Sequence, residues 1–336
     1  MKKIFFSQDV ALDHKSVILH LVQNLFRKGM IQGLIVSISA LFLFSSAASA
    51  FVSGSTGADG ALNPTANTEV VLPADGILNY TTINIPSGKT VTFKRNTANT
   101  PVYILATGDV TIAGTINVSG ASSSNTAPGI GGPGGYGGGY GGSTGLPGGK
   151  GLGPGGGDGG PGTTYRDGGG GGYATAGGTQ GASYGAGGST YGNVRIVPLV
   201  GGSGGGGQAG STTASGYGGG GGGGALLIAS SGTITVTGSI TAKGGDGANA
   251  PGGGSGGAIR LMATTITGTG TISAQGGSLS YLNKGGEGRI RLEADTNNFS
   301  AGTDPVYTSG TPGSVFMTNV PTLSIASVAG FNTPSN

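Results

Sequence analysis

The stretch GALLIASSGTITVTGSITAKGG, residues 224–245, decides the fold because a near copy, GAIRLMATTITGTGTISAQGG, follows at residues 257–277. Apolar residues in the first half of the two copies lie 33 positions apart and those in the second half lie 32 apart, so one residue is missing from the second copy. The matched pairs are Leu226 with Ile259, Ile228 with Leu261, Ile234 with Ile266, Ile240 with Ile272 and Ala242 with Ala274. Such a repeat is typical of a fold built from stacked units.

Further copies of the motif lie on both sides of this pair. A third copy begins at GRIRLEA, residues 288–294, and PVYILATGDVTIAGTINVSG, residues 101–120, matches the first copy at a spacing of 124. ILNYTTINIPSGKTVTF, residues 77–93, is interpreted as a still earlier copy. The repeat therefore occurs before and after the glycine-rich tract at 121–224.

Each copy alternates apolar and polar residues and is rich in β-branched side chains, as β-strands are. Gly232 and Gly238 in one copy, and Gly268 and Gly270 in the next, divide each copy into three predicted strands. Isoleucine aligns with isoleucine and glycine with glycine. The pattern therefore predicts an all-β fold, a short right-handed parallel β-helix in which each copy forms one coil. A β-sandwich, which also uses short strands, is the alternative.

The glycine-rich tract at 121–224 has a different sequence period from the β-strand copies. From Gly129 to Gly162, 21 of 34 residues are glycine, and glycines recur at every third position in several runs. Three residues per turn is the period of the polyproline II helix. We therefore predict a glycine-rich polyglycine or polyproline II-type helix bundle inserted between coils, with backbone groups of neighbouring segments bonded to one another. A flexible loop is the alternative that composition alone favours.

The predicted organisation begins with a signal peptide at 1–50, which is removed. Arg27 and Lys28 precede an apolar run and an A-x-A cleavage site that ends at Ala50. The run is shorter than a bilayer-spanning helix needs, so we predict export and no membrane span after cleavage, with an uncleaved anchor as the alternative. Met30 is an alternative start. The remaining parts are N-terminal coils at 51–120, the insertion at 121–224, C-terminal coils at 225–300 and a tail or strand at 301–336.

Charge and composition exclude several classes of function. Five of the 16 basic and two of the 13 acidic residues of the 336-residue chain lie in the first fifty positions, so eleven of each sign remain. With equal numbers of basic and acidic residues, the mature part lacks the excess of positive charge that nucleic-acid-binding proteins have. Both histidines, His14 and His20, lie in the same segment, and the chain has no cysteine. Ser-His-Asp and Cys-His catalysis, His or Cys metal sites and disulfides are thereby excluded from the mature part.

Several segments together resemble a group of uncharacterised secreted glycine-rich bacterial proteins. They are GSTGADGALNPTANTEVVLPADGILNYTTINIP at 54–86, TPVYILATGDVTIAGTINVSG at 100–120, PLVGGSGGGG at 198–207 and GGGGGGALLIASSGTITVTGSI at 219–240. The resemblance implies parallel β-helix repeats and an exported location, and it implies no reaction. The glycine tract is also loosely similar to the polyglycine II bundles of phage tail-fibre adhesins, to snow flea antifreeze proteins and to the glycine-rich domain of anaplastic lymphoma kinase.

Aromatic and basic side chains supply a binding hypothesis. Seven tyrosines fall in the glycine tract, where a rigid ring on a bare backbone can stack on sugars or on another subunit. The equal alternative is that the rings fill gaps between glycine helices. Two arginines align on the outer face of successive coils. The candidate binding residues are Tyr136, Tyr140, Tyr165, Tyr173, Tyr184, Tyr191, Tyr217, Arg260 and Arg291.

Threonines form a second candidate surface. With Ile234 and Val236 pointing inward, the alternating threonines point outward and stack in a ladder. Its members are Thr111, Thr233, Thr235, Thr237, Thr265, Thr267 and Thr269. A flat threonine array is the surface that ice-binding β-helices use, whereas threonine is also simply a good exposed strand residue.

No motif points to a reaction. SGKT at 87–90 lacks the upstream glycine of a phosphate loop. The acidic residues of the mature part are scattered, whereas paired-carboxylate catalysis needs two of them within about 5–10 Å. We predict no catalytic residue, metal or cofactor. The sequence favours an exported, non-catalytic structural or adhesive protein of the cell surface or extracellular matrix, which self-associates into fibres or binds a surface glycan. A carbohydrate-active β-helix enzyme and an ice-binding protein are the alternatives.

Overall fold

The computed structural model of the chain describes residues 50–249, 251–277, 282–316, 327–328 and 331–332. The predicted signal peptide lies outside these residues except for Ala50, and the predicted tail at 301–336 is described only in part. The described residues form β-strands and connecting segments and contain no helix. Accordingly, this part of the chain holds no apolar helix of membrane-spanning length.

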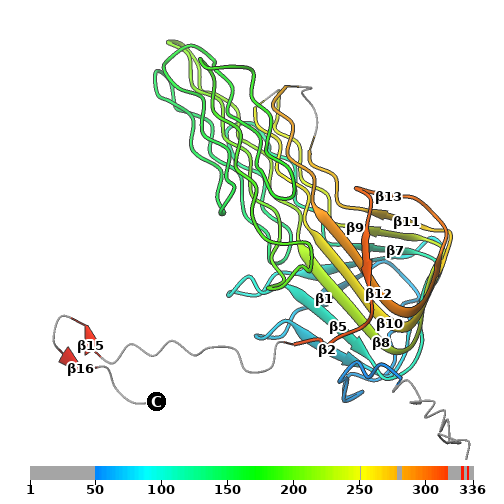
Figure 1. Cartoon of the computed structure of the whole chain (residues 1–336). Coiled ribbons are helices and arrows are strands. Elements are labelled where there is room, and N and C mark those ends of the chain that lie inside the picture. The colour runs from blue at the N-terminus through cyan, green and yellow to red at the C-terminus, as the bar shows by residue number, and fades with distance from the viewer. Residues whose placement is uncertain (1–49, 250, 278–281, 317–326, 329–330, 333–336) are drawn as a thin grey trace, which may run out of the picture. The chain divides into compact units, whose positions relative to one another are not determined.

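Most strands belong to two parallel sheets (Figure 1). The first has the order β1 (Thr68–Val71), β4 (Thr90–Lys94), β7 (Thr115–Asn117), β9 (Ser239–Thr241), β11 (Thr271–Ser273) and β13 (Thr303–Asp304). The second has the order β14 (Thr308–Gly310), β12 (Arg289–Phe299), β10 (Ala258–Gly268), β8 (Ala225–Val236), β5 (Val102–Ala106) and β2 (Ile77–Tyr80). In that sheet β3 (Ile83–Ile85) pairs with β6 (Val110–Ile112), which also pairs with β8. β15 (Ser327–Val328) and β16 (Phe331–Asn332) form a separate antiparallel pair.

Strand pairing follows the sequence repeat. β5 pairs with β8 at the predicted spacing of 124, with Val102 beside Leu226. β10 pairs with β8 as the two aligned copies require, and their register shifts between Ala263 and Thr265. This shift is the missing residue of the second copy, which the sheet absorbs as a β-bulge. The predicted all-β fold and its parallel pairing are thereby confirmed.

The division of each copy into three strands is correct for the two copies before the glycine tract and wrong for the two after it. The copy at 77–93 forms β2, β3 and β4, and the copy at 101–120 forms β5, β6 and β7. The copies that supply β8 with β9 and β10 with β11 each have one long and one short strand, because β8 runs without a break through Gly232. Side-chain hydrogen bonds carry the strand past this glycine: its N–H donates to Ser230 Oγ at 3.1 Å, and the Thr233 N–H donates to Asp109 Oδ1 at 2.8 Å. β8 ends at Val236, and Gly238 lies at the corner before β9, where a Cβ would lie 2.0 Å from Gly114 O, so only glycine fits there.

Apolar side chains from both parallel sheets form the main core. Ile104, Ile228 and Leu261 lie side by side in β5, β8 and β10, and each is fully buried. Ile240 and Ile272 contribute in the same way from β9 and β11. The alternating strand pattern puts these residues on one face, so stacking the copies removes their apolar surface from water.

Glycine-rich segments join the two sheets at three successive places. The longest, 118–224, runs from β7 to β8, and shorter ones at 242–257 and 274–288 run from β9 to β10 and from β11 to β12. Figure 1 shows their green and yellow traces side by side beyond the ends of the strands. The described parts of these three segments are called the glycine region below. The region and the two parallel sheets lie within one compact unit, Ala50–Asn336.

The two short glycine segments bond to the long one. The Gly252 N–H donates to Gly206 O at 3.0 Å, and the Gly286 N–H donates to Gly171 O at 2.7 Å. Both short segments fall within the stretch 225–300, which was predicted to form C-terminal coils. The glycines of the two short segments stand at equivalent places in successive copies of the repeat. This equivalence could have predicted that both short segments belong to the glycine region.

Candidate functional site

Residues 201–210 lie inside the glycine region, and each of them is buried. From Gly204 to Gly210 the N–H groups donate in a three-residue cycle, at N···O distances of 2.8 to 3.0 Å. Gly204, Gly207 and Gly210 donate to Leu152, Gly149 and Leu146, Gly205 and Gln208 donate to Gly220 and Tyr217, and Gly206 and Ala209 donate to Gly169 and Arg166. Because successive donors point to different neighbours and the direction recurs at every third residue, the backbone turns once in about three residues.

The carbonyl groups of the same segment accept hydrogen bonds from other neighbours. Gly205 O accepts from the Gly139 N–H at 2.9 Å, and Gly204 O accepts from the Gly157 N–H at 3.1 Å. A buried polar group left without a partner costs about 1–3 kcal/mol. The neighbouring segments thus satisfy buried backbone groups that few side chains are present to satisfy.

No side chain fits at the closest approaches between these segments. A Cβ added to Gly206 would lie 2.0 Å from Asp158 O, and one added to Gly207 would lie 2.0 Å from Tyr140 O. Both oxygens belong to backbone held in the hydrogen-bonded array. Glycine is required here by the spacing of the backbones.

Tyr173 and Tyr191 fill a gap in the glycine region. The Tyr173 side chain is 1% exposed, its ring centroid lies 4.7 Å from that of Tyr191, and the Arg289 guanidinium lies 5.4 Å from its centroid. The Tyr191 hydroxyl donates to Gly201 O at 2.6 Å and accepts from Ser203 Oγ at 3.0 Å. Burial raises the pKa of Tyr173 to about 12 and also raises the pKa of Tyr191. These two rings match the gap-filling alternative.

The other predicted tyrosines differ in how far they are exposed. Tyr140 and Tyr165 are exposed, whereas Tyr136, Tyr184 and Tyr217 are partly exposed.

Exposed aliphatic side chains accompany Tyr140. Ile130 and Leu152 stand on the segments that adjoin the Tyr140 segment, since the Gly138 N–H donates to Gly129 O and the Leu152 N–H donates to Gly137 O, both at 2.9 Å. Ile130, Tyr140 and Leu152 are called the apolar triad below.

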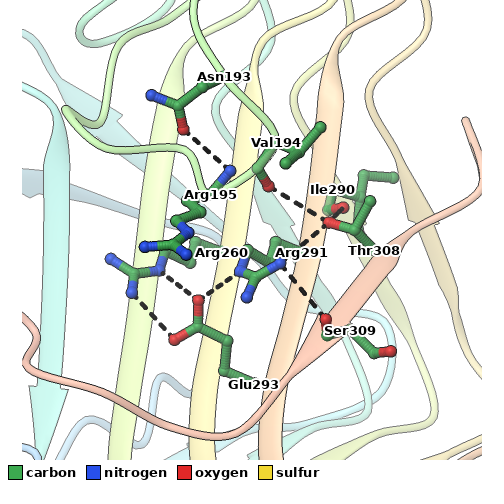
Figure 2. Close-up of polar contacts among 9 residues, drawn as sticks. All are labelled: Asn193, Val194, Arg195, Arg260, Ile290, Arg291, Glu293, Thr308 and Ser309. Carbon is green, nitrogen blue, oxygen red and sulfur yellow. Dashed lines mark hydrogen bonds and ion pairs between the residues drawn. The ribbon is translucent and has the colours of Figure 1, made fainter.

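Arg260 and Arg291 are neighbours in β10 and β12, as predicted. Figure 2 shows that Glu293 lies between them. Arg260 donates from Nη2 to Glu293 Oε2 at 2.9 Å and from Nε to Oε1 at 3.2 Å, and Arg291 Nε also donates to Oε1. Arg260 and Glu293 are only 6% and 3% exposed, so this ion-pair cluster is buried.

Glu293 was not predicted as a partner of the two arginines, because no other copy carries a carboxylate at the matching position. The signal was geometric: Glu293 lies two residues after Arg291 on the same face of β12, diagonal to Arg260 in β10. Side chains in diagonal positions on neighbouring strands are within reach of each other when they are long.

β8 and β10 are buried on both faces. Leu227 and Met262 face away from the main core and pack in a second cluster with Ile196 and Leu199. The run ALLIA in β8 is apolar without alternation, which is typical of a strand covered on both sides. The segment 193–200 thus returns the chain to the sheet by packing side chains against it, and it forms no strand.

A cavity of about 310 Å³ opens beside Arg260 under this segment. Its walls are residues 196–199 together with Tyr103, Leu227 and Phe316. The Tyr103 and Phe316 ring centroids lie 5.2 Å apart. Burial raises the pKa of Tyr103, and the charge of Arg260 opposes that rise.

The predicted threonine ladder is partly in register. Thr233 pairs with Thr265, and Thr235 pairs with both Thr267 and Thr111. The remaining two members, Thr237 and Thr269, lie just beyond the ends of β8 and β10 and are outside the paired strands.

Acidic side chains form no cluster of metal-binding type among the described residues. Glu287 nevertheless lies near Asp304: burial and then that carboxylate raise the pKa of Glu287, while Lys284 lowers it. Asp167 is buried, and its carboxylate accepts hydrogen bonds from Gln208 Nε2 at 2.6 Å and Gln180 Nε2 at 2.7 Å. Burial raises the pKa of Asp167, and these two bonds oppose that rise.

No family model, curated protein or solved structure matches this chain.

Proposed function

We propose that the chain is an exported, non-catalytic structural or adhesive protein of the cell surface or extracellular matrix. The observation that carries the proposal is the three-residue cycle of hydrogen bonds in 204–210. A region held by main-chain bonds at every step is stiff and offers few side chains for catalysis. It suits a role in contact and support.

The proposed fold is a short right-handed parallel β-helix with a polyglycine II-type bundle inserted between its coils. The in-register parallel pairing of successive copies supports the first part, because a β-sandwich is built from antiparallel sheets. The rotation of donors among three neighbours supports the second part. The resemblance to secreted glycine-rich proteins and to tail-fibre adhesins agrees with both.

The apolar triad is the proposed contact surface. Ile130, Tyr140 and Leu152 are 65%, 68% and 60% exposed, and they stand on backbone that the hydrogen-bond array holds in place. Presenting side chains from a rigid backbone lowers the entropy that binding costs. We propose that this surface mediates self-association or attachment to a glycan-covered surface.

Amide hydrogen exchange tests the stiffness of the glycine region. We expect the amides of 201–210 to be protected to the same degree as those of β8 and β10, whereas the exposed turn at 161–165 exchanges quickly. Exchange of 201–210 at the rate of an unstructured peptide would overturn the proposal.

A triple variant tests the contact surface. Replacing Ile130, Tyr140 and Leu152 by Ser is expected to reduce both self-association in size-exclusion chromatography and adhesion to cells. The matched control replaces Val71 and Val306, exposed apolar residues outside the glycine region, by Ser. Equal loss in both variants, or no loss in either, argues against the triad as the contact surface.

The register of Thr111, Thr235 and Thr267 favours ice binding as a second candidate. If the protein binds ice, we expect the purified protein to inhibit ice recrystallisation. The Thr235→Tyr variant should lose this activity and the Thr163→Tyr variant should keep it. Inactivity at high protein concentration would end it.

A further inference from the structure

We propose that the cavity beside Arg260 binds a carboxylate-bearing sugar, a uronic acid unit of an acidic polysaccharide. This inference names a ligand for the adhesive function proposed above and rests on it. It arises from a different part of the molecule, the sheet formed by β8, β10 and β12.

The buried cluster at the cavity is short of negative charge. Two guanidinium groups, those of Arg260 and Arg291, share the one carboxylate of Glu293. No other carboxylate pairs with either arginine within the part of the chain that the structure describes. A buried charge is stable only when it is paired, so the cluster favours a second anion.

Arg260 keeps one donor group free for that anion. Its Nε and Nη2 are bonded to Glu293, and Nη1 makes no hydrogen bond with a described residue. Arg195 lies next to the cavity-lining Ile196 in the chain, and its guanidinium likewise has no partner among the described residues. Figure 2 shows the Arg195 side chain pointing toward Arg260. Guanidinium groups are the side chains best suited to holding a carboxylate.

The walls of the cavity suit a sugar ring. Tyr103 and Phe316 supply an aromatic wall, and Leu227 with residues 196–199 supplies an aliphatic one. The volume of about 310 Å³ is at the lower end for small-molecule sites, which run from about 300 to 1,000 Å³. A ring that stacks on the aromatic wall and directs its carboxylate to Arg260 satisfies both features.

Calorimetric titration of the mature protein tests the proposal. The ligands are digalacturonic acid, the neutral digalactose of the same size, and hexanoate as a carboxylate without a sugar. We expect saturable binding of the acidic disaccharide and at least about tenfold weaker binding of the other two, because one lost charged hydrogen bond changes affinity about tenfold.

Three variants locate the site. Arg195→Gln is expected to weaken binding of digalacturonic acid about tenfold without affecting the fold, since its side chain has no partner among the described residues. Arg260→Gln leaves Glu293 paired with Arg291 and is expected to abolish binding, with circular dichroism confirming the fold. Lys243→Gln removes an exposed charge elsewhere and is expected to change nothing.

The outcomes separate this inference from the proposed function. Equal binding of acidic and neutral sugars, no binding by the folded wild type, or equal loss in Arg195→Gln and Lys243→Gln would overturn the cavity proposal. Hexanoate binding as tightly as the sugar acid would overturn its sugar component. Adhesion that persists in the arginine variants but is lost in the apolar-triad variant would overturn the cavity's role in adhesion and leave the proposed function standing.

Discussion

The sheets and the glycine region bury their residues in opposite ways. In the sheets, large side chains such as Ile104, Ile228 and Ile234 fill the space between strands and are fully buried. In the glycine region, residues such as Gly205 and Gly206 are equally buried, and backbone from neighbouring segments fills the space instead. Neither region contains a cysteine to cross-link it. One chain thus uses apolar side chains for one interior and paired backbone groups for the other.

This difference predicts opposite responses to side-chain size. The sheet interior loses stability when atoms are removed, because a cavity remains and apolar surface is no longer buried. The glycine interior loses stability when atoms are added, because two backbones must separate and their hydrogen bonds must lengthen or break.

Removing atoms from the sheet core is expected to have the largest effect. Ile228→Ala leaves a cavity between Ile104 and Leu261 and should lower the free energy of unfolding by about 3 kcal/mol. Urea unfolding followed by circular dichroism measures it, with Val71→Ala at an exposed position as the control. A loss below about 1 kcal/mol would contradict the stacked core.

Adding one methyl group to the glycine region is expected to come next. Gly206→Ala forces a Cβ against Asp158 O and should cost about 2 kcal/mol. Gly302→Ala is the matched control, since no atom lies within 4 Å of a Cβ there and its φ is ordinary. Hydrogen exchange of 201–210 should quicken in the first variant and stay unchanged in the second. Equal behaviour of the two would show that the glycine region is not closely packed.

A side chain inside the glycine region provides a smaller test of the same comparison. Tyr191→Phe keeps the ring against Tyr173 but removes the hydroxyl that bonds Gly201 O and Ser203 Oγ. We expect a loss of about 1 kcal/mol in the free energy of unfolding. Tyr165→Phe, at an exposed ring, should change nothing. An equally stable Tyr191→Phe variant would mean that main-chain bonds alone fix this part of the region.

The repeat made the sheets predictable. Matching apolar positions gave the parallel register and showed that one residue is missing between the two halves of the second copy, because every copy must present the same face to the core; the structure places the bulge between Ala263 and Thr265. Gly232 was wrongly predicted to end a strand, since the sequence does not distinguish a glycine at a corner from a glycine at a paired position within a strand. The hydrogen bonds of Ser230 and Asp109 decide that point, and they come from the fold.

The arginine cluster was less accessible from the sequence. Its register followed from the repeat, but burial of Arg260 did not, because the cover comes from residues 196–199, which lie far away in the chain. Glu293 has no counterpart in other copies, so alignment of copies could not reveal it. The exposure of individual tyrosines depends in the same way on which glycine segments adjoin them. The three-residue period of the glycines does not show which segments lie next to one another.

The smallest expected effect concerns pH and the carboxylate of Asp167. Burial raises its folded-state pKa, so in the range above the ordinary carboxyl pKa the folded protein binds more protons than the unfolded chain. Stability therefore falls as pH rises through the folded-state pKa, and the melting temperature should be higher at pH 5 than at pH 7 as far as this group is concerned. Asp167→Asn should narrow that difference. The pKa of Glu287 is also raised, so Glu287 lowers stability at high pH in the same way. Part of the difference in melting temperature should therefore remain in the Asp167→Asn variant.

Asp158→Asn is the control for this measurement, since that carboxylate is half exposed and paired with Lys150 at the surface. An unchanged difference in Asp167→Asn would mean that the two glutamine amides hold the ionised carboxylate as well as water does. In that case the glycine region would accommodate a buried charge as readily as it accommodates its own backbone. It would then differ more than burial alone implies from the outer face of the sheet, where Glu293 is buried with two arginines.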